Sequence, residues 1–403
     1  MGVAVSVKRV ALAQRAARLT PSMPAPEPHG VISLGSGHGS PGVFPDLNEM
    51  ARVALTQYRP ETLQYGPTLG LPEMREWIAG YMKENGVEGV TAGNVLVVNG
   101  AKHGLALVCR LLLDEGDAVV VTAPTYFTCI PIFKTFGAGF IEVSQDGDGM
   151  VVSELDDTLA RIQREGRPMP KLIYNVPDYH NPAGVTMPRE RREALVRVAE
   201  RYGVFVVEDS PYRRVRFEGE QQPMVKGFDR TDIVFVLGTV SKLVAPGLRI
   251  GWIVASTEMI ARLAQLKSDL GSCPLTQRII LEFCRGEHLD AHTRRVQDIY
   301  RKHRDTMVAA LRRELPEVSF AVPHGGYYLW LTLPERIEAD KLAPLALQEG
   351  VEIIPGSRFF AGKGPKGLGA PKNHMRLCYS HAEPEEIEEA IKRLARAVRS
   401  IES

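Results

Sequence analysis

The chain has 403 residues, of which 44% are hydrophobic and 24% charged, and its 49 Lys and Arg nearly balance its 48 Asp and Glu. A net charge of +1 gives no electrostatic footprint for nucleic acid or an anionic membrane, and no apolar run approaches the ~18 residues of a transmembrane helix. The five cysteines are scattered without C-x-x-C spacing, which favours reduced thiols in a cytoplasmic protein without a bound metal.

The first 45 residues are predicted to form an arm rather than a domain. Residues 1–19 could form a short helix, but four prolines between positions 21 and 28 then prevent regular structure. A glycine-rich stretch follows at residues 34–42. Because such an arm buries little surface by itself, we expect it to pack on another domain or subunit.

From about residue 94, predicted strands and helices alternate. The strands are short runs rich in Val and Ile at residues 94–99, 118–121, 172–175, 204–208, 233–237 and 250–255. Predicted helices between them include residues 101–113 and 188–202, the second with Pro188 in its first turn. Nearly continuous apolar strands are typical of a mostly parallel sheet buried on both faces. The sequence therefore predicts an α/β fold with a large, mostly parallel mixed sheet covered by helices.

The pattern changes again after residue 285. Residues 288–315 predict a long charged helix, residues 327–333 a strand, and residues 383–401 a closing amphipathic helix. We therefore predict three parts. These are the N-terminal arm (1–45), a large domain (46–285), and a smaller α+β domain (286–403) that packs with the arm.

The segment with the most chemical information is residues 237–251. Thr239, Ser241, Lys242 and Arg249 follow the end of a predicted strand, so their hydroxyls and positive charges could hold a phosphate. The alternative is a basic loop with solvated charges. A Pro-Gly turn and an apolar strand follow, however, which places Lys242 in a buried loop. A buried lysine loses its proton readily, and the neutral amine can form a Schiff base.

Residues 241–252, Ser-Lys-Leu-Val-Ala-Pro-Gly-Leu-Arg-Ile-Gly-Trp, resemble the lysine signature of pyridoxal-phosphate enzymes of the aspartate aminotransferase fold. The nearest branch is that of the α-aminoadipate and aromatic aminotransferases. Four further segments resemble motifs of this class I/II family in the same order, at residues 64–75, 174–184, 207–212 and 374–376. A single motif would be weak evidence for the family, but five motifs in the same order are specific to it. The resemblance implies transfer of the amino group of an L-amino acid to a 2-oxo acid, with pyridoxal 5'-phosphate as the cofactor.

The resemblance also implies roles around the cofactor ring. Lys242 would form the Schiff base and move the substrate proton, and Asp209 would keep the pyridine nitrogen protonated. Asn181 and Tyr212 would hydrogen-bond the ring oxygen O3′, and Tyr126 would stack on the ring. The alternatives without a role in cofactor binding are a surface position for Lys242, a helix N-cap for Asp209, a turn for Asn181 and a core position for Tyr126.

The cofactor phosphate is expected where a helix begins after residue 99, because free backbone N–H groups there point at the anion. Lys102 departs from the family pattern and could instead touch the substrate. Tyr65 would come from a second subunit, which implies a homodimer with shared active sites. The expected phosphate ligands are Gly100, Ala101, Lys102, Thr239, Ser241, Arg249 and the second subunit's Tyr65.

For the substrate, Arg376 would bind the α-carboxylate through a bidentate fork, the alternative being a surface arginine on an edge strand. Gly35 and Asn181 would also contact the substrate. His38 lies between two glycines and could be an extra catalytic acid or base, a role for which histidine is suited, but a loop histidine in water is an equal alternative.

Two other functions are weighed against transamination. An extra group such as His38 would suit a pyridoxal-phosphate-dependent oxidase, cyclase or lyase acting on an amino acid in specialised metabolism. A regulator that senses the cofactor is less favoured, because only about 45 residues precede the core and the charge is neutral.

Overall fold

The computed structural model describes residues 13–17, 30–362, 364 and 367–402. Helix α1 (Gln14–Ala17) falls within the stretch 1–19 that was expected to be helical. The rest of that stretch and the proline segment lie outside the described residues.

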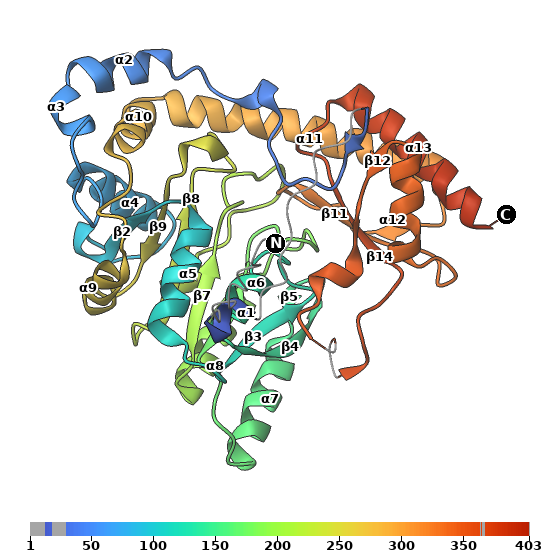
Figure 1. The fold of residues 1–403 in the computed structure, drawn as a ribbon, viewed down its shortest axis with the longest axis horizontal. Coiled ribbons are helices and arrows are strands. Elements are labelled where there is room, and N and C mark those ends of the chain that lie inside the picture. The colour runs from blue at the N-terminus through green and yellow to red at the C-terminus, as the bar shows by residue number, and fades with distance from the viewer. Residues whose placement is uncertain (1–12, 18–29, 363, 365–366, 403) are drawn as a thin grey trace, which may run out of the picture.

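A mixed sheet of eight strands in the described chain forms the centre of the molecule, in the order β2-β9-β8-β7-β6-β3-β4-β5 (Figure 1). Strands β8, β7, β6, β3 and β4 are parallel, whereas β9 runs antiparallel to both β2 and β8, and β5 runs antiparallel to β4. The bounds are β2 (Val95–Val98), β3 (Ala118–Ala123), β4 (Gly139–Asp146), β5 (Gly149–Met150), β6 (Leu172–Asn175), β7 (Phe205–Asp209), β8 (Val234–Thr239) and β9 (Gly251–Val254).

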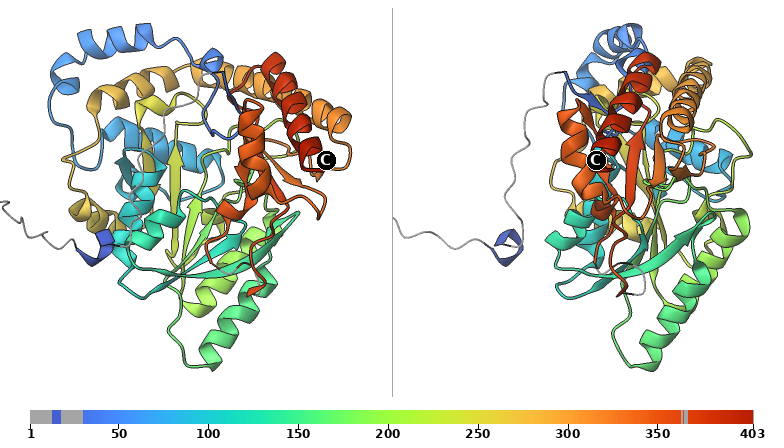
Figure 2. Two further views of the ribbon diagram at one scale, coloured as in Figure 1. Left: turned by 45° about the vertical axis from the view of Figure 1, so that its right-hand side comes forward. Right: turned by 90° about the vertical axis from the view of Figure 1, so that its right-hand side faces the viewer.

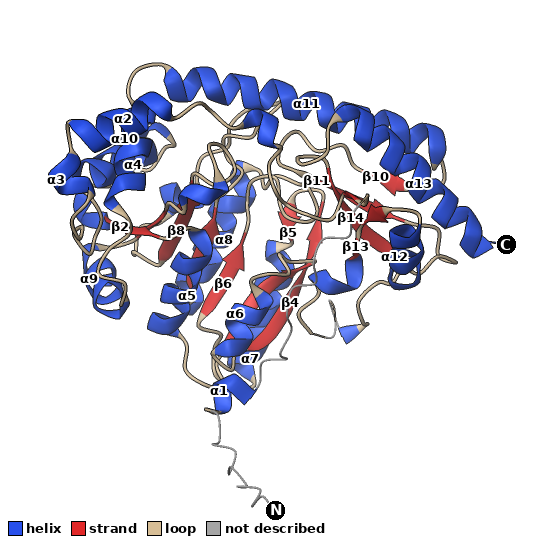
Figure 3. Cartoon of the chain, turned by 45° about the horizontal axis from the view of Figure 1, so that its top comes forward, coloured by secondary structure: helices blue, strands red, loops and turns tan. Residues whose placement is uncertain are grey.

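Helices cover both faces of this sheet (Figure 3). Leu105 and Val108 of α5 pack with one set of strand side chains, and Leu155 and Leu195 of α7 and α8 pack with the alternate set. Pro188 is the N-cap of α8 rather than a residue of its first turn. The bounds are α4 (Pro72–Glu84), α5 (Ala101–Leu112), α6 (Ile130–Thr135), α7 (Val152–Arg164), α8 (Arg189–Tyr202) and α9 (Thr257–Leu266).

The C-terminal part has its own antiparallel sheet, in the order β10-β11-β14-β13. The long helix α11 runs along one side of the molecule and ends beside α13, while α7 lies at the opposite end (Figures 1 and 2). The bounds are α10 (Pro274–Cys284), α11 (His288–Glu314), β10 (Ser319–Phe320), β11 (Tyr328–Thr332), α12 (Ala339–Gln348), β13 (Ile354–Pro355), β14 (His374–Cys378) and α13 (Pro384–Glu402).

The segment that precedes the large sheet forms a short strand pair with the C-terminal part. Strand β1 (Ile32–Ser33) lies parallel to β12 (Val351–Glu352), with Ser33 opposite Glu352. Helices α2 (Asn48–Thr56) and α3 (Arg59–Thr62) follow, and α2 packs on α10. The 3₁₀ helices are η1 (Pro41–Val43), η2 (Ala92–Asn94), η3 (Val225–Phe228), η4 (Pro246–Leu248) and η5 (Gly356–Phe359).

Within the ranges that the structure describes, no helix has both the length and the apolar character needed to span a bilayer.

Candidate active site

A cavity of about 870 Å³ opens where the glycine-rich arm crosses the large sheet and the C-terminal sheet. Its lining includes Gly35 and His38 from the arm, Tyr126 after β3, Lys242 after β8 and Arg376 on β14. The carboxyl ends of parallel strands are where α/β folds bind ligands. The structure therefore brings together five residues that the sequence spreads over more than 340 positions.

Lys242 is half-buried, with its ammonium group facing the arm. Its Nζ donates a 2.7 Å hydrogen bond to the Gly37 carbonyl and lies 5.3 Å from the centre of the Tyr327 ring. The Tyr327 hydroxyl also donates to the Lys242 carbonyl, which fixes the backbone here. Burial lowers the pKa of Lys242 to about 8. The residue is thus poised between its charged and neutral forms, unlike a solvated surface lysine.

Asp209 ends strand β7 and is 6% exposed. Its Oδ2 accepts a 2.6 Å hydrogen bond from the Tyr174 hydroxyl, but its buried Oδ1 has no partner among the described residues. Burial raises the pKa of Asp209 to about 6. Residues 210–224, all of which are described, form no helix, so the alternative of a helix N-cap for Asp209 is wrong. A buried acceptor without a donor fits the N–H group of a protonated pyridine ring.

Arg376 is 2% exposed, and β14 lies between β11 and β13, so it is not a surface arginine on an edge strand. Its Nη1 donates to Asn181 Oδ1 at 2.9 Å, and its Nη2 donates to the Gly35 carbonyl. The guanidinium carbon lies 4.2 Å from the centre of the Tyr328 ring. Arg376 Nε and Asn181 Nδ2 are both buried without partners in the described chain. Two donors therefore remain for ligands.

Tyr212 and Tyr126 flank this region. The buried Tyr212 hydroxyl donates to the Tyr328 hydroxyl at 3.1 Å, and burial raises the pKa of Tyr212 well above its usual value. Tyr126 lines the cavity, and burial raises its pKa as well. Sequence reasoning missed Tyr174, Tyr327 and Tyr328 as site residues. Tyr174 is the first residue of the motif at 174–184, and Tyr327 and Tyr328 begin the predicted strand at 327–333. Nothing in these sequence positions indicates that the three side chains lie at the site.

An anion-binding cup lies at the start of α5. Gly100 has φ of +90°, and a Cβ added there would lie 2.6 Å from Arg249 Nη2, so only glycine fits. Arg249 Nη2 donates to the Asn99 carbonyl at 2.9 Å, and Thr239 Oγ1 lies 2.8 Å from Ser241 Oγ. Gly100 supplies no side-chain cap, which leaves the first N–H groups of α5 available. The cup offers the Arg249 guanidinium, two hydroxyls and free N–H groups together.

None of the predicted phosphate ligands lines the cavity itself, and two of them have exposed side chains. Lys102 is exposed in the first turn of α5 and does not line the cavity. Tyr65 is 81% exposed and also lies outside the lining.

The arm is held against the site by its backbone. A Cβ at Gly37 would lie 2.3 Å from the Tyr328 hydroxyl, so a side chain there would displace the arm. The next residue, His38, is exposed at the cavity wall, and its carbonyl accepts a 2.6 Å hydrogen bond from Ser380 Oγ. The His38 ring meets the His381 ring edge-on, with 6.1 Å between centres.

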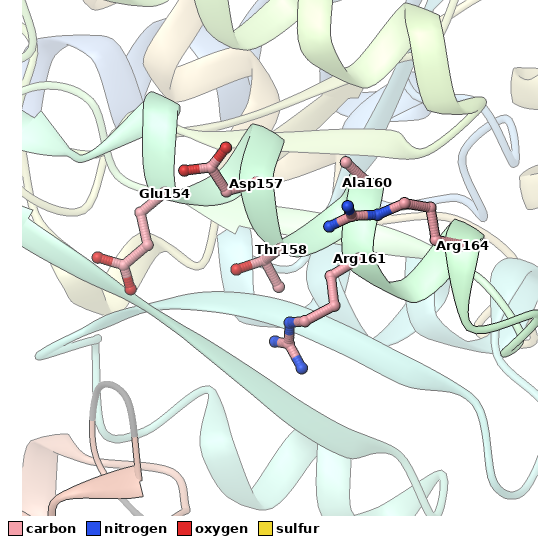
Figure 4. Close-up of a pocket in the computed structure, with 6 residues that line it drawn as sticks. All are labelled: Glu154, Asp157, Thr158, Ala160, Arg161 and Arg164. Carbon is pink, nitrogen blue, oxygen red and sulfur yellow. The ribbon is translucent and has the colours of Figure 1, made fainter.

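A second depression lies on α7 and has different chemistry. Figure 4 shows its carboxylates, Glu154 and Asp157, toward one end and its guanidinium groups, Arg161 and Arg164, toward the other. It shares no lining residue with the cavity at Lys242. The described residues contain no cluster of His, Cys, Asp and Glu side chains that could hold a metal ion.

Residues 30–394 match the family model described as aminotransferase class I and II, and the chain belongs to this family. It is 34% identical to aromatic-amino-acid aminotransferase 1 of Thermococcus litoralis, covering 96% of this chain and 93% of that protein. It is 32% identical to the 2-aminoadipate transaminase of Thermus thermophilus, covering 92% and 91%.

Comparison with solved structures supports the same family assignment. The kynurenine aminotransferase of Pyrococcus horikoshii, described in complex with PMP, superposes with a TM-score of 0.89 at 32% identity, covering 96% of this chain and 97% of that one. The protein is an aminotransferase of the aspartate aminotransferase fold that uses pyridoxal phosphate to move an amino group from an amino acid to a 2-oxo acid. The comparisons support this function and not the oxidase, cyclase or lyase alternative.

Proposed function

We propose that Lys242 is the covalent attachment point of the cofactor and the group that moves the proton at the substrate Cα. The observation that carries this proposal is the cavity that both Lys242 and Arg376 line, together with the buried Asp209 oxygen that has no partner among the described residues. Pyridoxal phosphate supplies an electron sink for the charge that develops at Cα. A lysine with a pKa of about 8 can both accept and return a proton near neutral pH.

The ring-binding residues are proposed from their unpaired or buried polar atoms. Asp209 Oδ1 would accept from the pyridine N–H, and its negative charge would keep that nitrogen protonated. Asn181 Nδ2 and the Tyr212 hydroxyl would bind the ring oxygen O3′, and Tyr126 would stack on the ring. Each of these atoms is buried, so a hydrogen bond to the cofactor removes a desolvation cost.

The phosphate would occupy the cup at the start of α5. Its proposed ligands are Gly100, Ala101, Lys102, Thr239, Ser241 and Arg249, joined by Tyr65 of a second subunit. The proposed homodimer is supported by an exposed apolar surface at Leu63, Tyr65 and Leu270, which are 62%, 81% and 65% exposed. The backbone at Gly271 packs against Gly66, so these side chains lie on adjoining loops.

On the substrate side, Arg376 would hold the α-carboxylate, with Asn181 and the backbone at Gly35 completing the clamp. The free Nε of Arg376 supports this role, because a carboxylate needs two parallel donors from the fork.

The proposed division into arm (1–45), large domain (46–285) and small domain (286–403) is supported by the pairing of β1 with β12. A cytoplasmic location is proposed from the unpaired cysteines.

His38 is proposed as an additional acid or base at the cavity wall. His38→Ala should leave the first spectral change on adding amino acid nearly intact and slow later steps by ~10²-fold, the usual worth of such a group. Stopped-flow absorbance measures both phases. Two phases within a small factor of wild type would identify His38 as a plain loop residue, and loss of the first phase alone would assign it to substrate binding.

The transamination half-reaction tests the proposed function. Holoenzyme mixed with an amino acid and no 2-oxo acid should release one equivalent of the product 2-oxo acid per subunit and lose its visible absorbance. Adding a 2-oxo acid should restore that absorbance. The Lys242→Ala variant should do neither, although it keeps the cup that holds phosphate. Full activity in Lys242→Ala would contradict the assignment.

A further inference from the structure

The cavity has a second set of lining residues that the cofactor and the α-carboxylate leave unused. They come from the arm, β12, α12 and η5. The apolar members include Val31, Ala343 and Leu347, and the polar ones are Ser33, Asp340, Glu352 and Arg358. This part of the cavity, which we call the distal chamber, is where a substrate side chain would extend once its carboxylate is held by Arg376.

Glu352 is fixed at the boundary between the distal chamber and the carboxylate clamp. Its Oε2 accepts a hydrogen bond from Ser33 Oγ, and Ser33 Oγ in turn accepts from the Ser36 N–H at 3.1 Å. A Cβ built at Gly35 would lie 3.1 Å from Glu352 Cδ. Because the Gly35 carbonyl accepts from Arg376, the carboxylate of Glu352 and the guanidinium of Arg376 approach the same residue. Glu352 is therefore close to any substrate on that clamp.

The charges in the distal chamber favour a positive or donating ligand. Asp340 accepts a 2.8 Å hydrogen bond from Ser357 Oγ, and Glu352 Oε1 has no donor among the described residues. Apart from Arg376 of the clamp, the guanidinium in this lining belongs to Arg358, which is exposed, whereas Glu352 is half-buried. Water screens an exposed charge more than a half-buried one, and the charge of Arg376 is matched by the α-carboxylate that it holds, so the negative charge of Glu352 outweighs the positive charge of Arg358 in the distal chamber.

We propose that Glu352 is a specificity-determining residue, which selects amino acids whose long apolar side chain ends in an amine or another hydrogen-bond donor over those that end in a carboxylate. A donor tip would pair with Glu352 Oε1, whereas a second carboxylate would lie near a like charge and leave that oxygen unpaired. This inference rests on the proposed function, in which Arg376 holds the α-carboxylate.

The test uses three amino acids of similar length that differ at the tip: L-lysine, L-norleucine and L-2-aminoadipate. The wild-type holoenzyme should have a kcat/KM for lysine at least ~10-fold above that for 2-aminoadipate. Glu352→Gln keeps the shape and an acceptor but removes the charge. It should lower the ratio of lysine to 2-aminoadipate by ~10-fold, about 1.4 kcal/mol, while norleucine changes less than ~3-fold.

Two matched variants make the result decisive. Glu349→Gln removes a carboxylate that forms a salt bridge with Arg396 outside the cavity, and it should leave the ratio unchanged. A uniform fall with all three substrates in Glu352→Gln would show that Glu352 only anchors the arm, which overturns the inference. A wild-type preference for 2-aminoadipate that is lost in Arg358→Gln would overturn it as well. Absence of the half-reaction with every amino acid tested would instead remove the proposed function, and this inference with it.

Discussion

The Nη1 atom of Arg376 donates a 2.9 Å hydrogen bond to Oδ1 of Asn181, which lies 195 positions earlier in the chain. This bond joins a loop of the large sheet to strand β14 of the C-terminal sheet. It also orients the Asn181 amide, because an oxygen that accepts from Arg376 leaves Nδ2 as the free donor. One contact thus sets the positions of a substrate group and a cofactor group relative to each other.

Replacing Arg376 should show how much its two parallel N–H donors contribute to activity. Arg376→Lys keeps the charge but loses the parallel donors and the bond to Asn181, so kcat/KM for any amino acid should fall by about 10²-fold. Steady-state kinetics measure this loss. The matched control is Arg262→Lys on the exposed face of α9, where a salt bridge to Glu258 is solvated and activity should not change.

The stability of the protein freed of its cofactor should depend on pH through Asp209. Its pKa is raised from 3.8 to about 6 by burial, so the folded state binds a proton more tightly than the unfolded state does. This contribution is fully present below pH ~4 and is lost as pH rises through 6, at a cost of roughly 3 kcal/mol. Asp209→Asn should therefore flatten the decline in unfolding free energy between pH 4 and 7. Denaturant unfolding of both proteins checks it, and parallel curves would contradict the assigned burial.

Gly37 provides a steric test of the arm. A Cβ at this position would lie 2.3 Å from the Tyr328 hydroxyl but 3.5 Å from the nearest ring carbon. Gly37→Ala should therefore lower kcat/KM by ~10-fold or more, because the arm must move away from Lys242. Adding Tyr328→Phe removes the clashing oxygen and should recover part of that loss. Gly147→Ala, where nothing lies within 4 Å of an added Cβ, is the control.

Subunit sharing can be tested by mixing two defective variants. A hybrid of Tyr65→Phe and Lys242→Ala subunits would contain one site with both residues intact. Adding inactive Lys242→Ala protein to Tyr65→Phe protein under conditions of subunit exchange should therefore raise the activity per Tyr65→Phe subunit. An unchanged activity despite proven exchange, or an active monomer in sedimentation, would refute shared sites.

The sequence predicts the large sheet well where the chain is apolar on both faces. The strands around Val97, Ile173 and Val207 are continuous in Val and Ile, and all are buried in the structure. Strand β4 (Gly139–Asp146) was not predicted, because it mixes polar and apolar residues and is mostly half-buried. Local patterns cannot show such a strand, since pairing with its neighbour β3 places it in the sheet.

The residues of the candidate site also fall into two groups, those that the sequence predicts and those that it does not. Lys242, Asp209 and Arg376 lie in segments with recognisable motifs, so the sequence predicts them. The tyrosines that surround them and the approach of Glu352 to Gly35 depend on contacts between distant segments. Tyr328, for example, meets Tyr212 across 116 positions, and no periodicity encodes that contact.

The most direct test of the account is borohydride reduction of the purified holoenzyme, followed by peptide mapping of the attached cofactor. The reduction should bleach the visible or near-ultraviolet band and leave the label on the peptide that contains Lys242, because only this lysine lines the cavity with Arg376 in the described chain. Label on Lys102 or on any other lysine would contradict the central claim.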